Sequence, residues 1–195
     1  MKKTIFFDLD GTLTDSGLGI TKCVQLALDH FGIHVEDRDE LRFFVGPPLR
    51  ESFAGYGLDQ MQIEEAVEVF RSRYVPIGKY ENEPYPGIRE LLTSLREEGH
   101  PMYVVTSKPV ICGADLEGKR DNKEDVIAYL QKKVGKLNNV VMVGDTHYDV
   151  LGAAAHGIPT IGVTWGFGSE ASLREAGAIA ITHTMEELHA CINSL

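Results

Sequence analysis

The chain has 195 residues, enough for one large domain or for a core with a smaller domain inserted into it. Its hydrophobic content of 43% and charged content of 25% are ordinary for a globular protein. The formal net charge is -10 and there is no stripe of Lys and Arg, so the composition excludes a nonspecific nucleic-acid binder.

The three cysteines, Cys23, Cys112 and Cys191, are odd in number and share no metal-ligand spacing. We therefore expect reduced thiols, as in a cytoplasmic protein. The apolar stretch near the N-terminus is interrupted at Asp8, which makes it too short for a signal peptide, and no run approaches membrane-spanning length. The sequence thus predicts a cytoplasmic protein without a membrane partner.

The first predicted element is a buried strand over Thr4 to Phe7, where all four residues are apolar or β-branched. Asp8 and Asp10 follow with one residue between them, so in an extended chain both carboxylates project to the same side. Gly11 permits a sharp turn, and the Thr12 hydroxyl can bind an anion or the backbone. The pattern predicts a site where a divalent cation offsets negative charge. The alternative is a plain turn, since Asp and Gly are common in turns.

Residues 15–83 are predicted to be helical, with no strand between the helices. The predicted helices are Ser16 to Phe31, Asp37 to Phe44, Leu49 to Phe53 and Asp59 to Tyr74. A cluster of Pro and Gly at residues 84–87 marks the end of this block. Because the block follows the first strand and precedes all the others, we predict an inserted α-helical cap domain.

Helices and strands alternate from Ile88 onward. The predicted helices are Ile88 to Gly99, Lys123 to Lys133 and Asp149 to His156, and the predicted strands are Met102 to Val105, Val140 to Val143 and Thr160 to Val163. This alternation predicts a parallel sheet with helical crossovers. The predicted fold is α/β, a Rossmann-like three-layer parallel-sheet core formed by residues 1–14 and 84–195, with the cap at residues 15–83.

One stretch does not fit this pattern. Three residues, Ser107 to Pro109, separate Thr106, at the end of the predicted strand, from Val110 to Cys112, which also has the composition of a strand. A parallel neighbour needs a crossover of about a dozen residues or more. Either Val110 to Cys112 is not a sheet strand, or residues are missing between Pro109 and Val110.

Three predicted strand ends are followed by segments that contain polar residues. They are Asp8, Asp10 and Thr12 after the first strand, Thr106, Ser107 and Lys108 after the second, and Gly144, Asp145 and Asp149 after the third. Ligands of open α/β sheets bind outside the carboxyl ends of the strands, so these groups are expected to converge. The set suits phosphoryl transfer through a covalent aspartyl intermediate.

In that chemistry Asp8 attacks phosphorus, while Asp10 protonates the leaving oxygen and later deprotonates water. A Mg²⁺ ion held by Asp8, Asp145 and the Asp10 carbonyl would let an anionic nucleophile approach an anionic phosphate.

A hydroxyl from Thr106 or Ser107 and a lysine ammonium would hold the transferring oxygens. Lys123 and Lys108 are the two candidates for that lysine.

Four motifs in chain order resemble those of the haloacid dehalogenase-like (HAD) phosphatases. They are Phe7 to Leu13, Val104 to Pro109, Asn122 with Lys123, and Val143 to Asp149. Three further stretches look most like the phosphoglycolate phosphatase-like branch: Gly46 to Leu49, Tyr85 to Gly87 and Thr164 to Gly168. Members of the family usually have a helix between the second motif and a segment resembling Ile111 to Arg120. The resemblance thus implies that residues are missing between Pro109 and Val110.

The resemblance also implies a role for each matching residue. The implied roles are Asp8 as nucleophile, Asp10 as acid and base, Thr106 with Ser107 beside it as phosphate-binding hydroxyls, Lys123 as the lysine that steadies nucleophile and phosphate, Asp145 as direct metal ligand and Asp149 as metal-site support. Lys108 would then lie near the site.

Gly11 and Thr12 would stand at the phosphate, and Arg50 in the cap is a candidate for binding a substrate carboxylate. Trp165 and Phe167 either line the cleft beneath the cap or pack in the interior.

We therefore expect a Mg²⁺-dependent phosphomonoesterase that acts on a small phosphorylated metabolite, as a monomer or homodimer. Phosphoglycolate is the first candidate substrate, followed by a nucleoside monophosphate or a sugar phosphate. A mutase is a related alternative. The alternative from another class is a noncatalytic phosphate-sensing or protein-binding module, since a fold does not fix a function.

Overall fold

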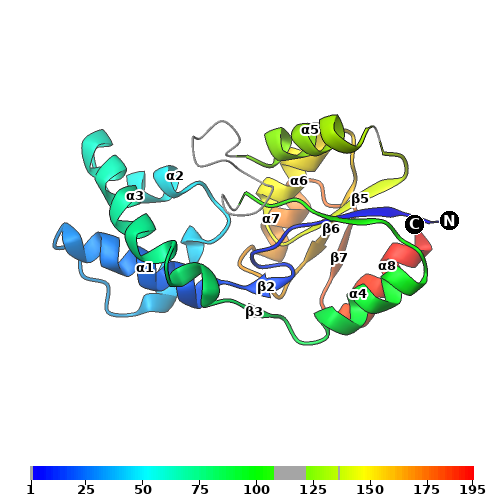
Figure 1. The fold of residues 1–195 in the computed structure, drawn as a ribbon, viewed down its shortest axis with the longest axis horizontal. Helices are drawn as coiled ribbons and strands as arrows, with labels where there is room; N and C mark the ends of the chain where they lie inside the picture. The colour runs from blue at the N-terminus through cyan, green and yellow to red at the C-terminus, as the bar shows by residue number, and fades with distance from the viewer. Residues whose placement is uncertain (1, 108–121, 136) are drawn as a thin grey trace. The chain divides into compact units, whose positions relative to one another are not determined.

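The computed structural model describes residues 2–107, 122–135 and 137–195 (Figure 1). The chain forms two compact units, one of Met1–Thr14 with Pro84–Leu195 and the other of Asp15–Glu83. The segments that join them, β2 (Thr14–Asp15) and β3 (Glu83–Pro84), pair as a two-stranded sheet.

The first unit is built on a five-stranded sheet with the order β4-β1-β5-β6-β7. Its strands are β1 (Thr4–Phe7), β4 (Met102–Val104), β5 (Val140–Gly144), β6 (Thr160–Val163) and β7 (Ala180–Thr182). Each neighbouring pair is parallel. The helices of this unit are α4 (Ile88–Glu97), α5 (Lys123–Val134), α6 (His147–Ala154), α7 (Glu170–Glu175) and α8 (Met185–Ser194). The predicted α/β fold is confirmed.

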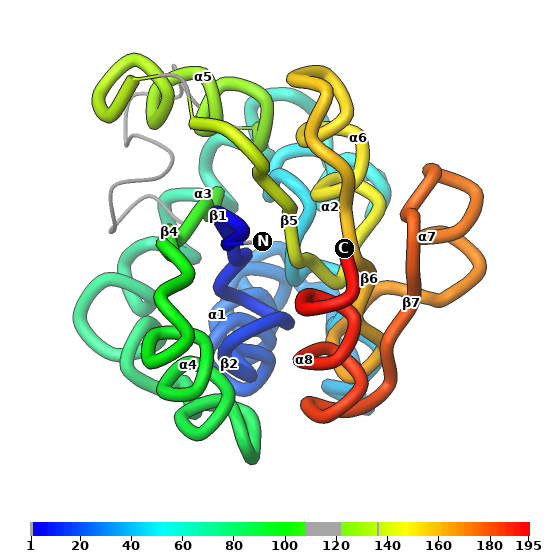
Figure 2. Tube along the Cα trace, turned by 90° about the vertical axis from the view of Figure 1, so that its right-hand side faces the viewer, coloured from blue at the N-terminus to red at the C-terminus, as the bar shows by residue number. Residues whose placement is uncertain are grey.

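Alternation along β1 creates two hydrophobic layers. Ile5 and Phe7 belong to a buried cluster that includes α4 and α8, through residues such as Leu95 and Leu188. Phe6 belongs to a second cluster, formed with α5 and α6. In Figure 2, α5 and α6 lie above the strands and α4 and α8 lie below them. Since both faces of the sheet are covered, the strands are apolar almost throughout.

The register of the central strands brings their carboxyl ends together. Phe7 is the partner of Val104 in β4 and of Val143 in β5. Beyond the strands, the Asp8 N–H donates to the Val143 carbonyl at 2.9 Å, and the Val105 N–H donates to the Phe7 carbonyl at 2.7 Å. The residues that follow β1, β4 and β5 therefore lie at one edge of the sheet.

The second unit is helical. Its elements are α1 (Gly17–His30), the 3₁₀ helix η1 (Arg38–Phe44), α2 (Leu49–Ala54), α3 (Gln60–Tyr74) and the 3₁₀ helix η2 (Gly78–Tyr80). Its core contains the rings of Phe44 and Phe53, which meet edge to face with centroids 5.0 Å apart. A capping box of Asp59 and Gln62 begins α3.

Several predicted boundaries differ from the observed ones. The segment predicted as a helix over Asp37 to Phe44 is a 3₁₀ helix, started by the Asp37 carboxylate, which accepts from the Asp39 N–H at 2.9 Å. The helix expected from Asp149 begins at His147, because Thr146 caps it. Helices α7 and α8 and strand β7 were not predicted. Strand β7 and helix α7 are short, and α7 buries a single side chain, Leu173, which gives little periodic signal; α8 is longer and was missed without that reason.

The expectations for Lys108, for Cys112 and for missing residues between Pro109 and Val110 lie outside the described residues. Within the described ranges, every helix is too short or too polar to cross a bilayer.

Candidate active site

Three buried carboxylates gather at the edge of the sheet where β1 and β5 end. Asp8 follows β1, Asp145 follows β5, and Asp149 lies in the first turn of α6. Their exposed fractions are 5%, 0% and 0%. One oxygen from each lies within 4.8 Å of the others. Because burial removes the water that would hydrate them, this concentration of negative charge needs a counterion.

Lys123, the first residue of α5, brings an ammonium group to this cluster. Its Nζ contacts Asp8 Oδ1, lies 2.9 Å from Asp149 Oδ1 and donates to the Val105 carbonyl at 2.7 Å. The close approach of α5 to α6 depends on Gly152, where a Cβ would stand 2.4 Å from the Lys123 Cβ. The structure thus supplies Lys123 as the lysine beside Asp8.

The charges shift one another's ionisation. Burial, reinforced by the negative charges of Asp149 and Asp145, raises the pKa of Asp8 well above its usual range, although Lys123 opposes this shift. Burial, together with the charge of Asp149, raises the pKa of Asp145 to about 7. Burial alone would lower the pKa of Lys123, but Asp149 and Asp8 outweigh it and raise that pKa. Lys123 is therefore a permanent cation, whereas burial makes the charged forms of Asp8 and Asp145 unfavourable.

The donor set fits a hard divalent cation. The three carboxylates carry more negative charge than the single Lys123 ammonium balances among the described residues. Carboxylate oxygens are the ligands that Mg²⁺ and Ca²⁺ prefer. Asp149 is already engaged, since its Oδ2 accepts from the Thr146 N–H at 3.0 Å and from the Thr146 hydroxyl at 2.9 Å. Asp145 also accepts one hydrogen bond on each oxygen, so the roles of Asp8 and Asp145 as direct ligands and of Asp149 in support stay predictions.

The first loop places the remaining predicted residues of that motif. Asp10 is half-buried and pairs through its backbone with Thr14. Gly11 has φ +95°, and a Cβ there would stand 2.2 Å from Asp145 Oδ2, so both its backbone and its surroundings require glycine. The Thr12 hydroxyl donates to Asp145 Oδ1 at 3.0 Å. The structure therefore directs the Thr12 hydroxyl to a carboxylate of the cluster.

Thr106 and Ser107 follow β4 at the same edge of the sheet. Thr106 is 1% exposed and Ser107 is half-buried. Their predicted role in binding phosphate remains a prediction, as does that of Lys108, which is outside the described residues. Arg50 belongs to the helical unit, where its guanidinium pairs bidentately with Glu64 at 2.7 and 2.8 Å. A substrate carboxylate would compete with Glu64 for the edge of the guanidinium formed by Nε and Nη2.

From the sequence, Trp165 and Phe167 in the loop after β6 were expected either to line the cleft beneath the cap or to pack in the interior, and their contacts with Asp145 and Thr12 were not predicted. There the Phe167 N–H donates to Asp145 Oδ2 at 2.8 Å, and the Trp165 Nε1 donates to the Thr12 carbonyl at 3.0 Å. The signal that could have identified this loop is its pair of glycines, Gly166 and Gly168, directly after a buried strand, which indicates a close approach of backbone to another group.

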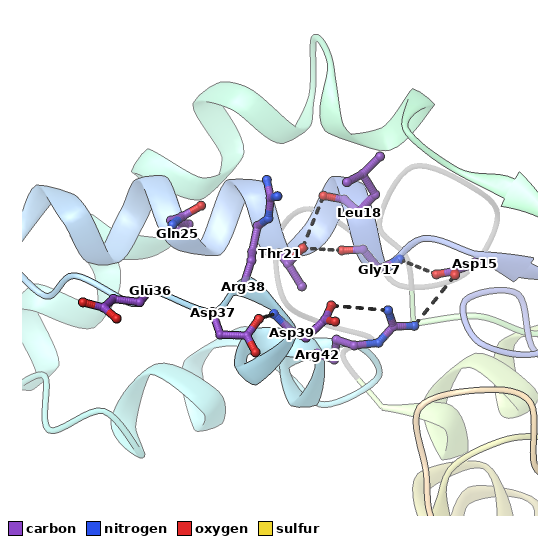
Figure 3. A pocket seen from close by; sticks show the side chains of 10 residues that line it. All are labelled: Asp15, Gly17, Leu18, Thr21, Gln25, Glu36, Asp37, Arg38, Asp39 and Arg42. Atoms are coloured by element: carbon purple, nitrogen blue, oxygen red, sulfur yellow. Dashed lines mark hydrogen bonds and ion pairs between the residues drawn. The ribbon is translucent and has the colours of Figure 1, made fainter.

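The helical unit has a polar pocket of about 460 Å³ (Figure 3). It is bordered by α1, η1 and the segments preceding them, and its lining residues are Asp15, Gly17, Leu18, Thr21, Gln25, Glu36, Asp37, Arg38, Asp39 and Arg42. The Arg42 guanidinium lies 3.8 Å from Asp15 and 3.7 Å from Asp39. The pocket therefore presents guanidinium, carboxylate, amide and hydroxyl groups together.

Comparison with known proteins gives consistent matches along most of the chain. The family profile described as haloacid dehalogenase-like hydrolase matches residues 5–163. A 5'-nucleotidase from Pseudomonas aeruginosa is 43% identical over 190 residues, covering 87% of this chain and 86% of the relative. The tyrosine-protein kinase PtkA from Mycobacterium tuberculosis is 38% identical over 205 residues, covering 94% of this chain and 70% of the relative.

Among solved structures, that of a predicted phosphatase from Clostridium acetobutylicum is similar over the whole length of both chains, with 41% identity and a TM-score of 0.95. Phosphoglycolate phosphatases also match, at lower identity.

Proposed function

The chain belongs to the haloacid dehalogenase-like hydrolase family, and we propose that it is a phosphatase that hydrolyses monoesters of small metabolites through a phosphorylated Asp8. The observation that carries this proposal is the buried contact of Asp8 with Lys123 beside Asp145 and Asp149. A carboxylate with a raised pKa and a permanent cation beside it is typical of an active site.

The reaction has two covalent steps. An Asp8 oxygen forms a bond to phosphorus while the ester P–O bond breaks, and Asp10 gives its proton to the leaving oxygen. Water then attacks phosphorus and loses a proton to Asp10, while the bond to Asp8 breaks and phosphate is released. Lys123 supports both steps, because its ammonium favours the charged form of Asp8 and would meet the transferring oxygens. Thr106 and Ser107 would supply further donors to those oxygens.

Magnesium is the cofactor that this donor set fits. Asp8, Asp145 and the Asp10 carbonyl would hold it, with Asp149 in support. Once bound, the ion would neutralise charge and let two anions approach each other. Asp149 has two tasks of its own, since it holds Lys123 through Oδ1 and the start of α6 through Oδ2.

Substrate choice is assigned to the helical unit, residues 15–83, acting as a cap. Phosphoglycolate is the first candidate from the sequence, but 43% identity to a 5'-nucleotidase favours nucleoside monophosphates. The pocket in Figure 3 supports this preference, because its mixture of donors and acceptors suits a base and a ribose better than a single carboxylate.

The test is phosphate release from a panel of nucleoside monophosphates, phosphoglycolate and sugar phosphates, with and without Mg²⁺. We expect Mg²⁺-dependent release by the wild type, none by Asp8→Asn, and wild-type rates for Asp125→Asn, a matched change at an exposed position of α5. Activity retained by Asp8→Asn would refute the nucleophile. Absence of release from every ester would favour a binding module. Transfer of phosphate from ATP to tyrosine without ester hydrolysis would favour the activity named for the relative PtkA.

A further inference from the structure

The loop after β6 holds the backbone and the side chain of Asp145 at close quarters. A Cβ on Gly166 would stand 2.3 Å from Asp145 Oδ2, and one on Gly168 would stand 2.1 Å from the Asp145 carbonyl oxygen. Real Cβ contacts are not this short, so any side chain at either position would push Asp145 aside. The two glycines therefore make room for a direct backbone contact with this carboxylate.

Hydrogen bonds from two different loops fix both oxygens of that carboxylate. Oδ1 accepts from the Thr12 hydroxyl at 3.0 Å, and Oδ2 accepts from the Phe167 N–H at 2.8 Å. The indole of Trp165 then ties the two loops together by donating to the Thr12 carbonyl at 3.0 Å. We call Thr12, Trp165, Gly166 and Phe167 the Asp145 clasp.

The hydrogen bond from Thr12 to Asp145 is buried, while Trp165, Gly166 and Phe167 are half-buried. Asp145 is 0% exposed and Thr12 is 1% exposed, so water does not compete for their hydrogen bonds. Because each oxygen accepts one hydrogen bond, the orientation of the carboxylate plane is fixed. The oxygen lone pairs that remain for a cation therefore point in set directions before the cation binds. Outer residues of this kind orient ligands and tune affinity for a metal.

A fixed carboxylate does not serve all cations equally. Mg²⁺ demands near-ideal octahedral geometry with short bonds, whereas Ca²⁺ accepts six to eight oxygens at longer, variable distances. Preventing Asp145 from rotating or withdrawing thus favours the smaller ion. We propose that the Asp145 clasp is a positioning device that makes the site select Mg²⁺ over Ca²⁺, and that the Thr12 hydroxyl serves Asp145 rather than the substrate. This inference rests on the proposed metal site.

The test measures cation binding without turnover. Apparent affinities for MgCl₂ and CaCl₂ are taken from the concentration dependence of the thermal unfolding midpoint of the substrate-free protein. Thr12→Val removes the hydroxyl at constant shape, and Thr12→Ser keeps it. Thr182→Val is the matched control, because Thr182 is also buried and bonds the Gly162 carbonyl away from Asp145.

We expect Thr12→Val to lose about tenfold or more in Mg²⁺ affinity, with a smaller loss for Ca²⁺, so that the preference for Mg²⁺ falls. Thr12→Ser and Thr182→Val should keep the wild-type preference. Trp165→Phe, which removes the indole donor while retaining an aromatic ring, should shift the preference in the same direction and serves if Thr12→Val does not fold.

Two results would overturn the inference in distinguishable ways. A wild type that prefers Mg²⁺, with variants that lose both affinities by the same factor or lose neither, refutes the clasp and leaves the proposed function standing. A wild type that binds neither ion refutes the metal site and, with it, the clasp.

Discussion

Replacing Lys123 by Met removes the cation that three buried carboxylates share. The Nζ lies 2.9 Å from Asp149 Oδ1 and also contacts Asp8, and its side chain is 5% exposed. At an effective dielectric constant of about 20, one charge pair at this distance is worth roughly 6 kcal/mol before desolvation is considered. Loss of one partner from a buried pair costs about 3–5 kcal/mol, because the remaining charge has no compensation. We expect a loss of that size at pH 8.

The sign of the pH dependence follows from the pKa of Asp8. A carboxyl whose pKa is raised by folding binds its proton more tightly in the folded state, so its contribution to stability falls as the pH rises above the unfolded value of about 4. Removal of Lys123 raises the folded pKa further and deepens this effect. The destabilisation by Lys123→Met should therefore be larger at pH 8 than at pH 5.5, where the carboxylates take up protons.

Urea unfolding followed by circular dichroism, in EDTA at both pH values, measures this difference. Lys132→Met is the matched control, because Lys132 is an exposed lysine on the same helix, and its effect should stay within about 0.5 kcal/mol. A loss that is equal at the two pH values, or larger at pH 5.5, would refute Lys123 as the counterion of the cluster.

Three further predictions concern the metal, the loop after β6 and the helical unit. A proton and a cation compete for Asp145, whose pKa is about 7, so the apparent Mg²⁺ affinity should rise about tenfold between pH 6 and pH 8. Calorimetric titration at the two pH values measures this affinity. An affinity that does not change with pH would contradict the assignment of Asp145 as a ligand. Gly166→Ala should lower Mg²⁺-dependent turnover at least tenfold while the protein stays folded, because the added methyl displaces Asp145; unchanged turnover would show that the loop tolerates a side chain. Arg73 and Lys22 hold the pKa of Glu81 at about 2, so the roughly 1–2 kcal/mol that Glu81 contributes to stability is present above pH 4 and lost as the pH falls towards 2. Glu81→Gln should therefore lower the free energy of unfolding at pH 7 and match the wild type near pH 2. An equal difference at both pH values would argue against the ion pairs as the cause.

The convergence of Asp8 and Asp145 could be predicted from the sequence, because each follows a strand that is recognisable locally. Apolar residues before Asp8 and before Gly144 identify two buried strands, and the carboxyl ends of parallel strands meet at one edge. The position of Lys123 is less local. Spacing alone left Lys123 and Lys108 as rivals, and the contacts of Lys123 with Asp8 and Asp149 appear only once α5 packs beside α6.

Contacts between distant loops could not be predicted. Trp165 and Phe167 follow β6, whereas Thr12 follows β1. Trp165 contacts Thr12, and Phe167 contacts Asp145 at the end of β5, which lies between β1 and β6 in the sheet. The short elements α7 and β7 were missed because six or fewer residues hold too few buried positions to show a hydrophobic period. The longer α8 would have allowed such a period to be seen.

That residues are missing between Pro109 and Val110 stays a prediction. The mass of the expressed protein tests this prediction, and a mass of 21.5 kDa would contradict it.

The most direct test of the central claim is to find the phosphoryl group on Asp8. The wild type, mixed with Mg²⁺ and a substrate from the panel, is quenched in acid within the first turnover, digested and analysed by tandem mass spectrometry. We expect one phosphoryl group on the peptide that contains Asp8, and none in Asp8→Asn. Release of phosphate in the first turnover with no phosphorylated peptide, or with the phosphoryl group on another residue, would contradict it.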